Sequence, residues 1–274
     1  MTDRLLDVVR RSDMQVFDLG RPMFVGMPQS PNHPQYWHTL PRRHGDSSRA
    51  DGSSAANDLL VTGTHVGTHI DALAHVSYKG RLHGGGDAAA EQAGGRFMQH
   101  GVHTIAPIIT RGLLLDVPAA LGLDSCPAGY EITVSDLEKT VADHGVRPEA
   151  GDVVLIRSGW GRQFGEGTDA YVGRDSGVPG VGEEGAAWLA DAEVLAVGAD
   201  TIAFERLAPG GGHALLPAHR LLLVERGIYI MEALDLEGLG EAGVHEFTFV
   251  AIPLNLVGAT GSPIRPLAVV GPAS

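Results

Sequence analysis

The sequence has a single cysteine, no long apolar run and few basic residues. Because Cys126 is alone, an internal disulfide is excluded. No apolar run reaches the roughly 18 residues that a membrane-spanning helix needs. Lys and Arg number 20 against 33 Asp and Glu, which gives a formal net charge of −13. Since nucleic acids and anionic membranes both attract basic surfaces, neither is expected as a partner.

Several catalytic motifs are missing as well. The chain has no GxxxxGK phosphate-binding loop and no GxSxG nucleophile elbow. The stretch HVGTH lacks the glutamate of the HExxH metalloprotease helix. Cys126 lies in the turn-like stretch GLDSCPAGY and is expected to be free and buried rather than a catalytic thiol.

The N-terminal segment is unlike an export signal. Its sequence, MTDRLLDVVRRSDM, carries acidic residues and lacks a long apolar core. Together with the unpaired cysteine, this segment favours a cytoplasmic location.

Length and composition predict one globular domain. With 274 residues, of which 43% are hydrophobic, the chain is long enough to bury a substantial core. The 38 glycines and 16 prolines are spread along the chain and predict many turns. Neither an internal repeat nor a sharp break in composition is present, so residues 1–274 are predicted to form a single domain.

Hydrophobic patterning predicts a mixture of strands and helices. The predicted strands are 14–19, 59–71, 112–117, 151–159, 194–201, 228–234 and 246–257, and the predicted helices are 134–145, 183–193 and 219–227. In the first helix, Ser135 and Glu138 are expected to form a capping box, and Gly145 to end the helix. The alternation is too irregular for a simple βαβ series. We therefore expect an α/β single domain with a mixed parallel and antiparallel central sheet, flanked by helices.

Two long polar segments separate these elements. Residues 20–58 are rich in Pro, Gly, Ser, His and Arg, and residues 161–182 are polar and glycine-rich. Both are expected to be irregular, and long irregular segments in compact domains are often functional. They are candidates for lids over a site or for arms at an interface between subunits.

The stretch THVGTHIDALAH concentrates three histidines and an aspartate in a short segment. On a helix these four side chains would diverge, whereas in a strand their odd-numbered positions share one face. The β-branched residues between them favour the strand. Two imidazoles and a carboxylate on one face suit Zn²⁺ or Mn²⁺, with His65, His69 and Asp71 as the ligands. Gly67 would leave room for something bound, and His75 would lie close enough for proton transfer.

The order His-x-Gly-Thr-His-x-Asp-x-x-x-His resembles the motif of the metal-dependent cyclase-like hydrolases, a family that includes bacterial kynurenine formamidase and isatin hydrolase. The resemblance extends to FDLGRPMFVGMPQSPNHP near the start and to the later stretches GADTIAFE and HRLLLVERGIYIMEAL. It implies the cyclase-like swivelling β/β/α fold. It also implies a homo-oligomer, either a dimer or a tetramer.

The same resemblance implies one or two Zn²⁺ or Mn²⁺ ions per subunit, with His75 as the acid/base residue and Asp71 able to bridge two ions. The metal ligands that it implies are His65, His69, Asp71, His219 and Glu232. Glu232 lies among apolar residues, and a buried carboxylate needs a cation or hydrogen-bond donors. His213, which follows three glycines, stays an alternative to His219 as the later ligand.

The chain departs from the family pattern at two positions. Leu73 stands where many members have proline, which puts the geometry of that bend in question. Ala233 follows Glu232 where the family often has asparagine, and this change could alter the support of that carboxylate.

The expected reaction is hydrolysis of an amide bond in a small molecule, either an aryl formamide or a cyclic amide such as isatin. A metal would lower the pKa of its water and polarise the carbonyl, while His75 moves a proton. A lactonase or cyclase acting on a related carbonyl, and a non-catalytic metal-bound binding module, remain alternatives.

Other candidate side chains have no assigned role. Trp37, Trp160 and Phe204 could stack on a flat substrate or could simply pack inside the protein. Arg157 could hold a carboxylate but is expected to form a structural ion pair.

Overall fold

The computed structural model describes residues 13–271. Most of the N-terminal segment, for which no export signal is predicted, lies outside these residues. Within the described chain, no helix combines the length and apolarity that a membrane span requires.

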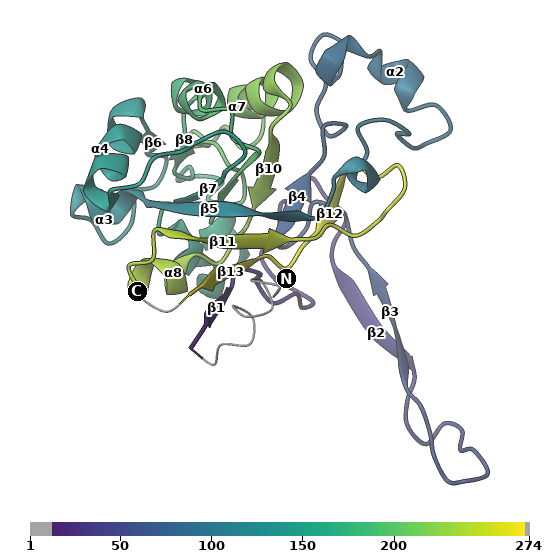
Figure 1. Ribbon diagram of the computed structural model, residues 1–274. Coiled ribbons are helices and arrows are strands. Elements are labelled where there is room, and N and C mark those ends of the chain that lie inside the picture. Colours follow the sequence, from purple (N-terminus) through teal and green to yellow (C-terminus); the bar gives the residue numbers. More distant parts are fainter. Residues whose placement is uncertain (1–12, 272–274) are drawn as a thin grey trace, which may run out of the picture.

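A nine-stranded mixed sheet forms the centre of the fold (Figure 1). Four neighbouring strands, β5, β7, β9 and β10, run parallel, whereas the strands on both sides of them pair antiparallel. The predicted mixed α/β fold is therefore confirmed. In spatial order the strands are β1 (Gln15–Asp18), β13 (Leu267–Val270), β11 (Glu246–Ala251), β5 (Ile108–Asp116), β7 (Val153–Arg157), β9 (Ala196–Ala199), β10 (Tyr229–Glu232), β4 (His69–Asp71) and β12 (Gly261–Pro263).

Both faces of the sheet are buried at its parallel centre. Along β7, Val154 and Ile156 pack into the core on one face, while Val153 and Leu155 pack into the core on the other. This two-sided burial explains why the strand is a continuous apolar run. The first core is covered by α3 (Val117–Leu121), α4 (Val134–His144), α6 (Glu183–Asp191), α7 (Pro217–His219) and the π-helix η4 (Arg220–Arg226), and the second by α8 (Glu237–Glu241).

Shorter elements lie between these strands and helices. They are η1 (His83–Gly85), α2 (Ala88–Glu91), η2 (Val102–Thr104), β6 (Glu131–Ile132), η3 (Trp160–Glu166), α5 (Thr168–Val172) and β8 (Gly180–Val181). The expectation that residues 161–182 are irregular is therefore wrong in part, because these residues include most of η3 and all of α5 and β8.

The capping box of α4 is not the predicted one. Thr133 is the N-cap, its hydroxyl accepts the backbone N–H of Asp136, and the Asp136 carboxylate accepts the N–H of Thr133. The helix begins at Val134, so Ser135 already lies inside its first turn. Gly145 ends the helix in the left-handed conformation, as predicted, with φ of 65°.

Residues 20–58 are not wholly irregular. Strands β2 (Trp37–Arg42) and β3 (Asn57–Val61) form an antiparallel hairpin, called the arm below, which projects from the body of the protein (Figure 1). The hairpin has no buried face, so its strands lack the alternating burial of a sheet that packs on a core. The prediction from patterning failed here for that reason.

Some strand boundaries also differ from the prediction. The strand expected over 246–257 ends at Ala251, and an exposed loop that contains Pro253 follows it. The strand expected over 59–71 is divided into β3 and β4 by a turn. Strands β12 and β13 were not predicted. Each is only three or four residues long, which gives patterning too short a window.

Candidate metal centre

Strand β4 places two of the predicted ligands side by side. His69 and Asp71 alternate with Ile70 and therefore lie on one face of the strand. On the neighbouring strand β10, Glu232 is directly opposite His69. Cross-strand partners of this kind have side chains close enough to interact. The sheet register thus brings together three groups from two distant parts of the sequence.

His65 reaches the same place from a turn rather than from a strand. Gly67 has φ of 69°, in the left-handed region that favours glycine, so the predicted continuous strand over these residues is wrong. A Cβ atom on Gly67 would meet Cγ of Met23 at 3.4 Å. The glycine is therefore needed for the turn, and the expectation that it leaves space for a ligand is also wrong. Even so, Nδ1 of His65 lies 2.6 Å from Oδ1 of Asp71.

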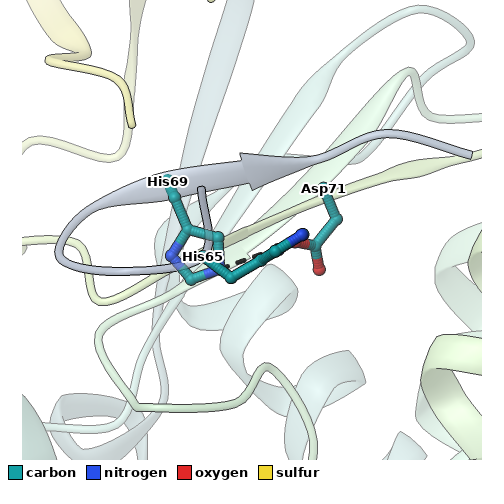
Figure 2. A group of neighbouring side chains, drawn as sticks. All are labelled: His65, His69 and Asp71. Carbon is teal, nitrogen blue, oxygen red and sulfur yellow. Dashed lines mark hydrogen bonds and ion pairs between the residues drawn. The ribbon is translucent and has the colours of Figure 1, made fainter. Parts of the chain in front are cut away.

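Two groups of buried side chains have the donor atoms that a metal ion needs. In each group the donor atoms lie within 4.8 Å of one another. The first group is His65, His69 and Asp71, and the second is Asp71, His219 and Glu232. Figure 2 shows the first group beside β4. Asp71 is common to both groups, and its role as a bridge between two ions stays a prediction.

His219 comes from α7, at the start of a helical segment that packs against the sheet. Its Nε2 atom lies 3.0 Å from Oε1 of Glu232 and 3.8 Å from Oδ2 of Asp71. His213 belongs to neither group of donor atoms. Of the two alternatives that the sequence left open, the geometry favours His219.

Sequence reasoning missed Glu205, which contacts the ring nitrogen of His219 that does not face Glu232 and Asp71. The side chain is buried, and Oε1 lies 2.8 Å from Nδ1 of His219. Glu205 is the last residue of the GADTIAFE stretch, so a carboxylate at the end of that block was the available signal.

The buried carboxylates of Asp71 and Glu232 make the centre favourable for positive charge. Burial acts to raise the pKa of Glu232, but hydrogen bonds from His219 and His69 hold it well below its ordinary value. Burial opposes protonation of both histidines, yet their carboxylate partners raise the pKa of His69 to about 9 and that of His219 to about 10. A divalent cation would satisfy the same demand for positive charge.

Asp71 provides the direct test of whether a metal fits. Among the residues that the structure describes, its buried Oδ2 atom has no hydrogen-bond partner. A buried, unpartnered carboxylate oxygen is costly, and a cation removes that cost. The surrounding nitrogen and oxygen donors are those that Zn²⁺ and Mn²⁺ accept. The residues therefore fit a divalent ion.

His75 lies beside the centre without being part of either donor group. Its ring stacks on that of His65 with centroids 3.9 Å apart, and the centroid of His219 is 6.4 Å away. Burial lowers the pKa of His75 to about 4, so the imidazole is neutral near pH 7. A neutral imidazole next to the donor cluster can accept a proton.

The two departures from the family pattern have structural consequences. Leu73 is partly buried and packs against the apolar core. Ala233 is buried with φ of 54°, a conformation that alanine adopts rarely and asparagine more readily. The carbonyl of Ala233 accepts the hydroxyl hydrogen of Thr68 at 2.7 Å, which ties β10 to the turn before β4.

A cavity of about 820 Å³ lies near the centre, although none of the predicted metal ligands lines it. It is lined by residues of the loop 25–36 and of the segment 168–176, among them Tyr36 and Arg174. His33 also lines it, and its ring stacks on that of His65 with centroids 5.3 Å apart. The volume is in the range of small-molecule sites. Sequence reasoning missed His33, whose proline-rich context gave no sign of its position.

Two of the three aromatic candidates pack inside the protein. Phe204 is fully buried in the core, and Trp160 is buried with Nε1–H donating to the carbonyl of Tyr171. Trp37 is exposed on the arm. As expected, Cys126 is free and buried.

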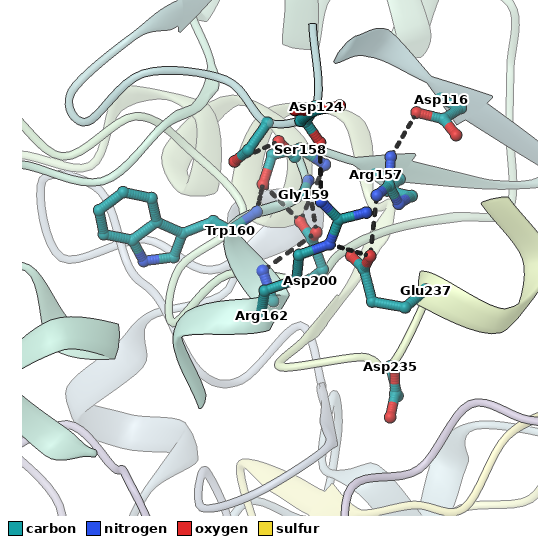
Figure 3. Close-up of polar contacts among 12 residues, drawn as sticks. Asp116, Asp124, Arg157, Ser158, Gly159, Trp160, Arg162, Asp200, Asp235 and Glu237 are labelled. Carbon is teal, nitrogen blue, oxygen red and sulfur yellow. Dashed lines mark hydrogen bonds and ion pairs between the residues drawn. The ribbon is translucent and has the colours of Figure 1, made fainter. Parts of the chain in front are cut away.

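Arg157 forms the expected structural ion pair, with Asp116 at 2.7 Å and Glu237 at 2.8 Å (Figure 3). Figure 3 also shows the Asp200 carboxylate, which accepts the backbone N–H groups of Ser158 and Gly159. These contacts fix the chain where β7 ends.

Comparisons with known proteins find related sequences and structures. The model of the cyclase family, described as a putative cyclase, matches residues 17–206. The isatin hydrolase of Roseibium aggregatum is 26% identical over 224 residues, which cover 81% of this chain and 77% of that protein. A crystal structure described as a novel cyclase is 29% identical with a TM-score of 0.84, over 98% of this chain and 93% of that one. Isatin hydrolase A from Ralstonia solanacearum is 26% identical with a TM-score of 0.73, over 97% and 96%.

Proposed function

Because this chain belongs to the cyclase family, we propose that it is a divalent-metal-dependent hydrolase that cleaves a C–N amide bond. The substrate would be an aryl formamide or a cyclic amide of the isatin type. The observation that carries the proposal is the buried Asp71, which is shared by two groups of metal donors and has one oxygen without a hydrogen bond within the described chain. The similarity to isatin hydrolases supports the amide bond as the target.

The residues that would hold the metal are His65, His69, Asp71, His219 and Glu232, which suit one or two Zn²⁺ or Mn²⁺ ions. Such an ion supplies Lewis-acid polarisation of a carbonyl and acidification of a water molecule near neutral pH. Because the donors are buried, a charged group there would be poorly screened by solvent, and its electrostatic effect would be strong.

His75 would move the proton. In amide hydrolysis, the water oxygen bonds to the acyl carbon, the C–N bond breaks, and the nitrogen gains a proton. Neutral His75 would accept the proton from the attacking water and then donate it to the leaving nitrogen.

The cavity next to His65 would hold the substrate. Its wall combines apolar, aromatic and polar side chains, such as Val25, Tyr36 and Gln29. That mixture suits a flat aromatic amide, with the ring against apolar surface and its polar groups near hydrogen-bonding side chains. His33 would lie between the bound molecule and the metal donors, because it lines the cavity and stacks on His65.

Two alternatives use the same residues. An ester or lactone needs the same activated water and the same proton donor, so a lactonase or cyclase remains a second candidate. A non-catalytic binding module is less favoured, because a neutral histidine beside the donor cluster has no evident structural purpose.

The testing experiment combines elemental analysis with rates of N-formylkynurenine and isatin hydrolysis. Rates would be measured before chelation, after chelation, and after adding back Zn²⁺ or Mn²⁺. Activity that disappears with the metal and returns with it supports the proposal. A protein that takes up no metal contradicts it. Bound metal without amide turnover, but with lactone turnover, favours the second candidate.

A further inference from the structure

Glu205 contacts a predicted metal ligand without being one itself. The residue is only 2% exposed. Its carboxylate accepts the backbone N–H of Ala218 at 3.1 Å and that of His219 at 2.9 Å. Oε1 also lies 2.8 Å from Nδ1 of His219. The carboxylate therefore fixes both the backbone and the imidazole ring of one residue.

This contact determines which nitrogen of His219 keeps its hydrogen when a metal ion binds. A carboxylate only accepts hydrogen bonds, so the hydrogen must be on Nδ1. The other nitrogen, Nε2, faces Glu232 and Asp71 at 3.0 Å and 3.8 Å. A metal-binding imidazole must offer an unprotonated nitrogen, and the partner of the other nitrogen selects which one it is.

In the other group, the only carboxylate paired with His65 is the predicted ligand Asp71, and among the described residues no carboxylate outside the ligand set contacts His65 or His69. In His69, Nδ1 lies 2.8 Å from the backbone carbonyl of Gly67, which fixes the same tautomer with a neutral acceptor. His219 alone of these two ligands is supported by a carboxylate, and a negative charge makes an imidazole a stronger donor. The two metal positions should therefore respond differently when that charge is removed.

We propose that Glu205 is a positioning residue that sets the metal affinity of the position formed by Asp71, His219 and Glu232. It does so by holding His219 with Nε2 directed into the site. The inference rests on the proposed metal centre and goes beyond it, because it assigns a role to a residue outside the ligand set.

The test is a calorimetric titration of metal-free protein with Zn²⁺. Glu205→Gln keeps the shape of the side chain but removes its charge. An amide has one accepting oxygen instead of two, so it cannot accept all three of the hydrogen bonds that the carboxylate accepts. His219→Ala identifies which binding phase belongs to the second position. Glu131→Gln is the matched control: Glu131 lines the same cavity of about 310 Å³ as Glu205, yet its side chain is 51% exposed and pairs with Arg206.

Glu205→Gln should weaken the His219-dependent phase by roughly 10–100-fold and leave any other phase near its wild-type affinity. Glu131→Gln should match the wild type. Unchanged affinity of the His219-dependent phase in Glu205→Gln would overturn the role of Glu205 while leaving the proposed function intact. A wild-type protein that binds no Zn²⁺ would overturn both.

A second measurement needs no variant. Long-range ¹H–¹⁵N spectra of the zinc-loaded wild type, with His219 assigned by substitution, report which imidazole nitrogen carries hydrogen. The proposal requires hydrogen on Nδ1 and none on Nε2. The opposite tautomer would overturn it even if Glu205→Gln failed to fold.

Discussion

At the residue scale, Asp71 is the side chain on which both groups of metal donors depend. Asp71→Asn removes the negative charge and one metal-accepting oxygen, so we expect metal content and activity to be lost together. Elemental analysis and amide-hydrolysis rates would measure both. Asp58→Asn is the control, because Asp58 is an exposed carboxylate on the arm that pairs with His38 and should change neither quantity. Retention of both metal and activity by Asp71→Asn would contradict the prediction.

The role of His75 predicts a different outcome. His75→Ala removes the proton carrier but none of the predicted ligands, so the metal should stay bound. The rate should fall by about 10² to 10⁴, the usual contribution of a general acid or base. Metal analysis beside steady-state kinetics separates the two effects. A variant with bound metal and full activity would exclude His75 from proton transfer.

Cys126 should be unreactive in the folded protein. Burial, reinforced by the nearby Asp200 carboxylate, raises the pKa of its thiol to about 12. The raised pKa means that the protonated form dominates up to that pH, so near pH 8 only about one thiol in 10⁴ is the reactive thiolate. A colorimetric thiol reagent at pH 8 should detect the cysteine only after denaturant is added. Rapid labelling of the native protein would show that the residue is accessible.

The sequence revealed residues whose partners lie nearby in the chain. His65, His69 and Asp71 fall within one short stretch, so their chemistry could be predicted even though the strand geometry drawn from it was wrong. Glu205 and His33 have no such partners nearby in the sequence. They reach the centre only through long-range contacts, Glu205 with His219 and His33 with His65, and no local pattern encodes those contacts.

At the scale of single elements, the end of β7 depends on one buried guanidinium. Arg157 links Asp116, the last residue of β5, to Glu237, the first residue of α8. Arg157→Met would leave the buried Asp116 carboxylate without its cation and leave Glu237 with only the exposed Arg162. Breaking a buried ion pair on one side costs about 3–5 kcal/mol. Urea denaturation should show a loss of free energy of unfolding in that range.

Arg162→Met is the control for this prediction. Arg162 also contacts Glu237, at 2.7 Å, but its side chain is 47% exposed. Exposed ion pairs contribute roughly 0–1 kcal/mol, so this variant should unfold close to the wild type. If both variants lost the same free energy of unfolding, burial would not explain the contribution of Arg157, and the prediction would be wrong.

Element prediction succeeded where burial is two-sided or where a helix has clear ends. The apolar runs at β5 and β7 were found because both faces of these strands are covered. Helix α4 was found from its period and from Gly145, although its N-terminal cap was assigned two residues too late. The arm was missed because neither of its faces packs against the body, and β12 and β13 because they are short.

At the scale of the whole molecule, the centre exists because the sheet is mixed. Strand β4 inserts between β10 and β12, and antiparallel pairing sets Glu232 opposite His69. Sequence patterning indicated a mixed sheet but not its strand order. That order depends on contacts between segments more than 100 residues apart, which only the completed fold supplies. The family resemblance suggested the pairing of early and late ligands before any geometry did.

The arm bears on the predicted homo-oligomer, which remains a prediction. A two-stranded hairpin is marginally stable on its own in water. Leu59 and Val61 lie opposite Thr39 and Trp37 in the hairpin register, so Trp37, Leu59 and Val61 share one face, and all three are about half exposed. Because apolar side chains on an uncovered hairpin face favour association, we expect a second copy of the chain to cover this face.

The double variant Leu59→Ser, Val61→Ser should therefore lower the oligomeric state. Light scattering should give the wild type a mass of two or four times 28.7 kDa, the mass of one chain. The variant should have a mass near that of one chain. Leu123→Ser is the matched control, because Leu123 is an exposed apolar residue on the body rather than on the arm. A wild type that is monomeric would contradict the oligomer. An oligomer that survives the double variant would place its interface elsewhere and leave the arm to another role, such as a lid beside the cavity.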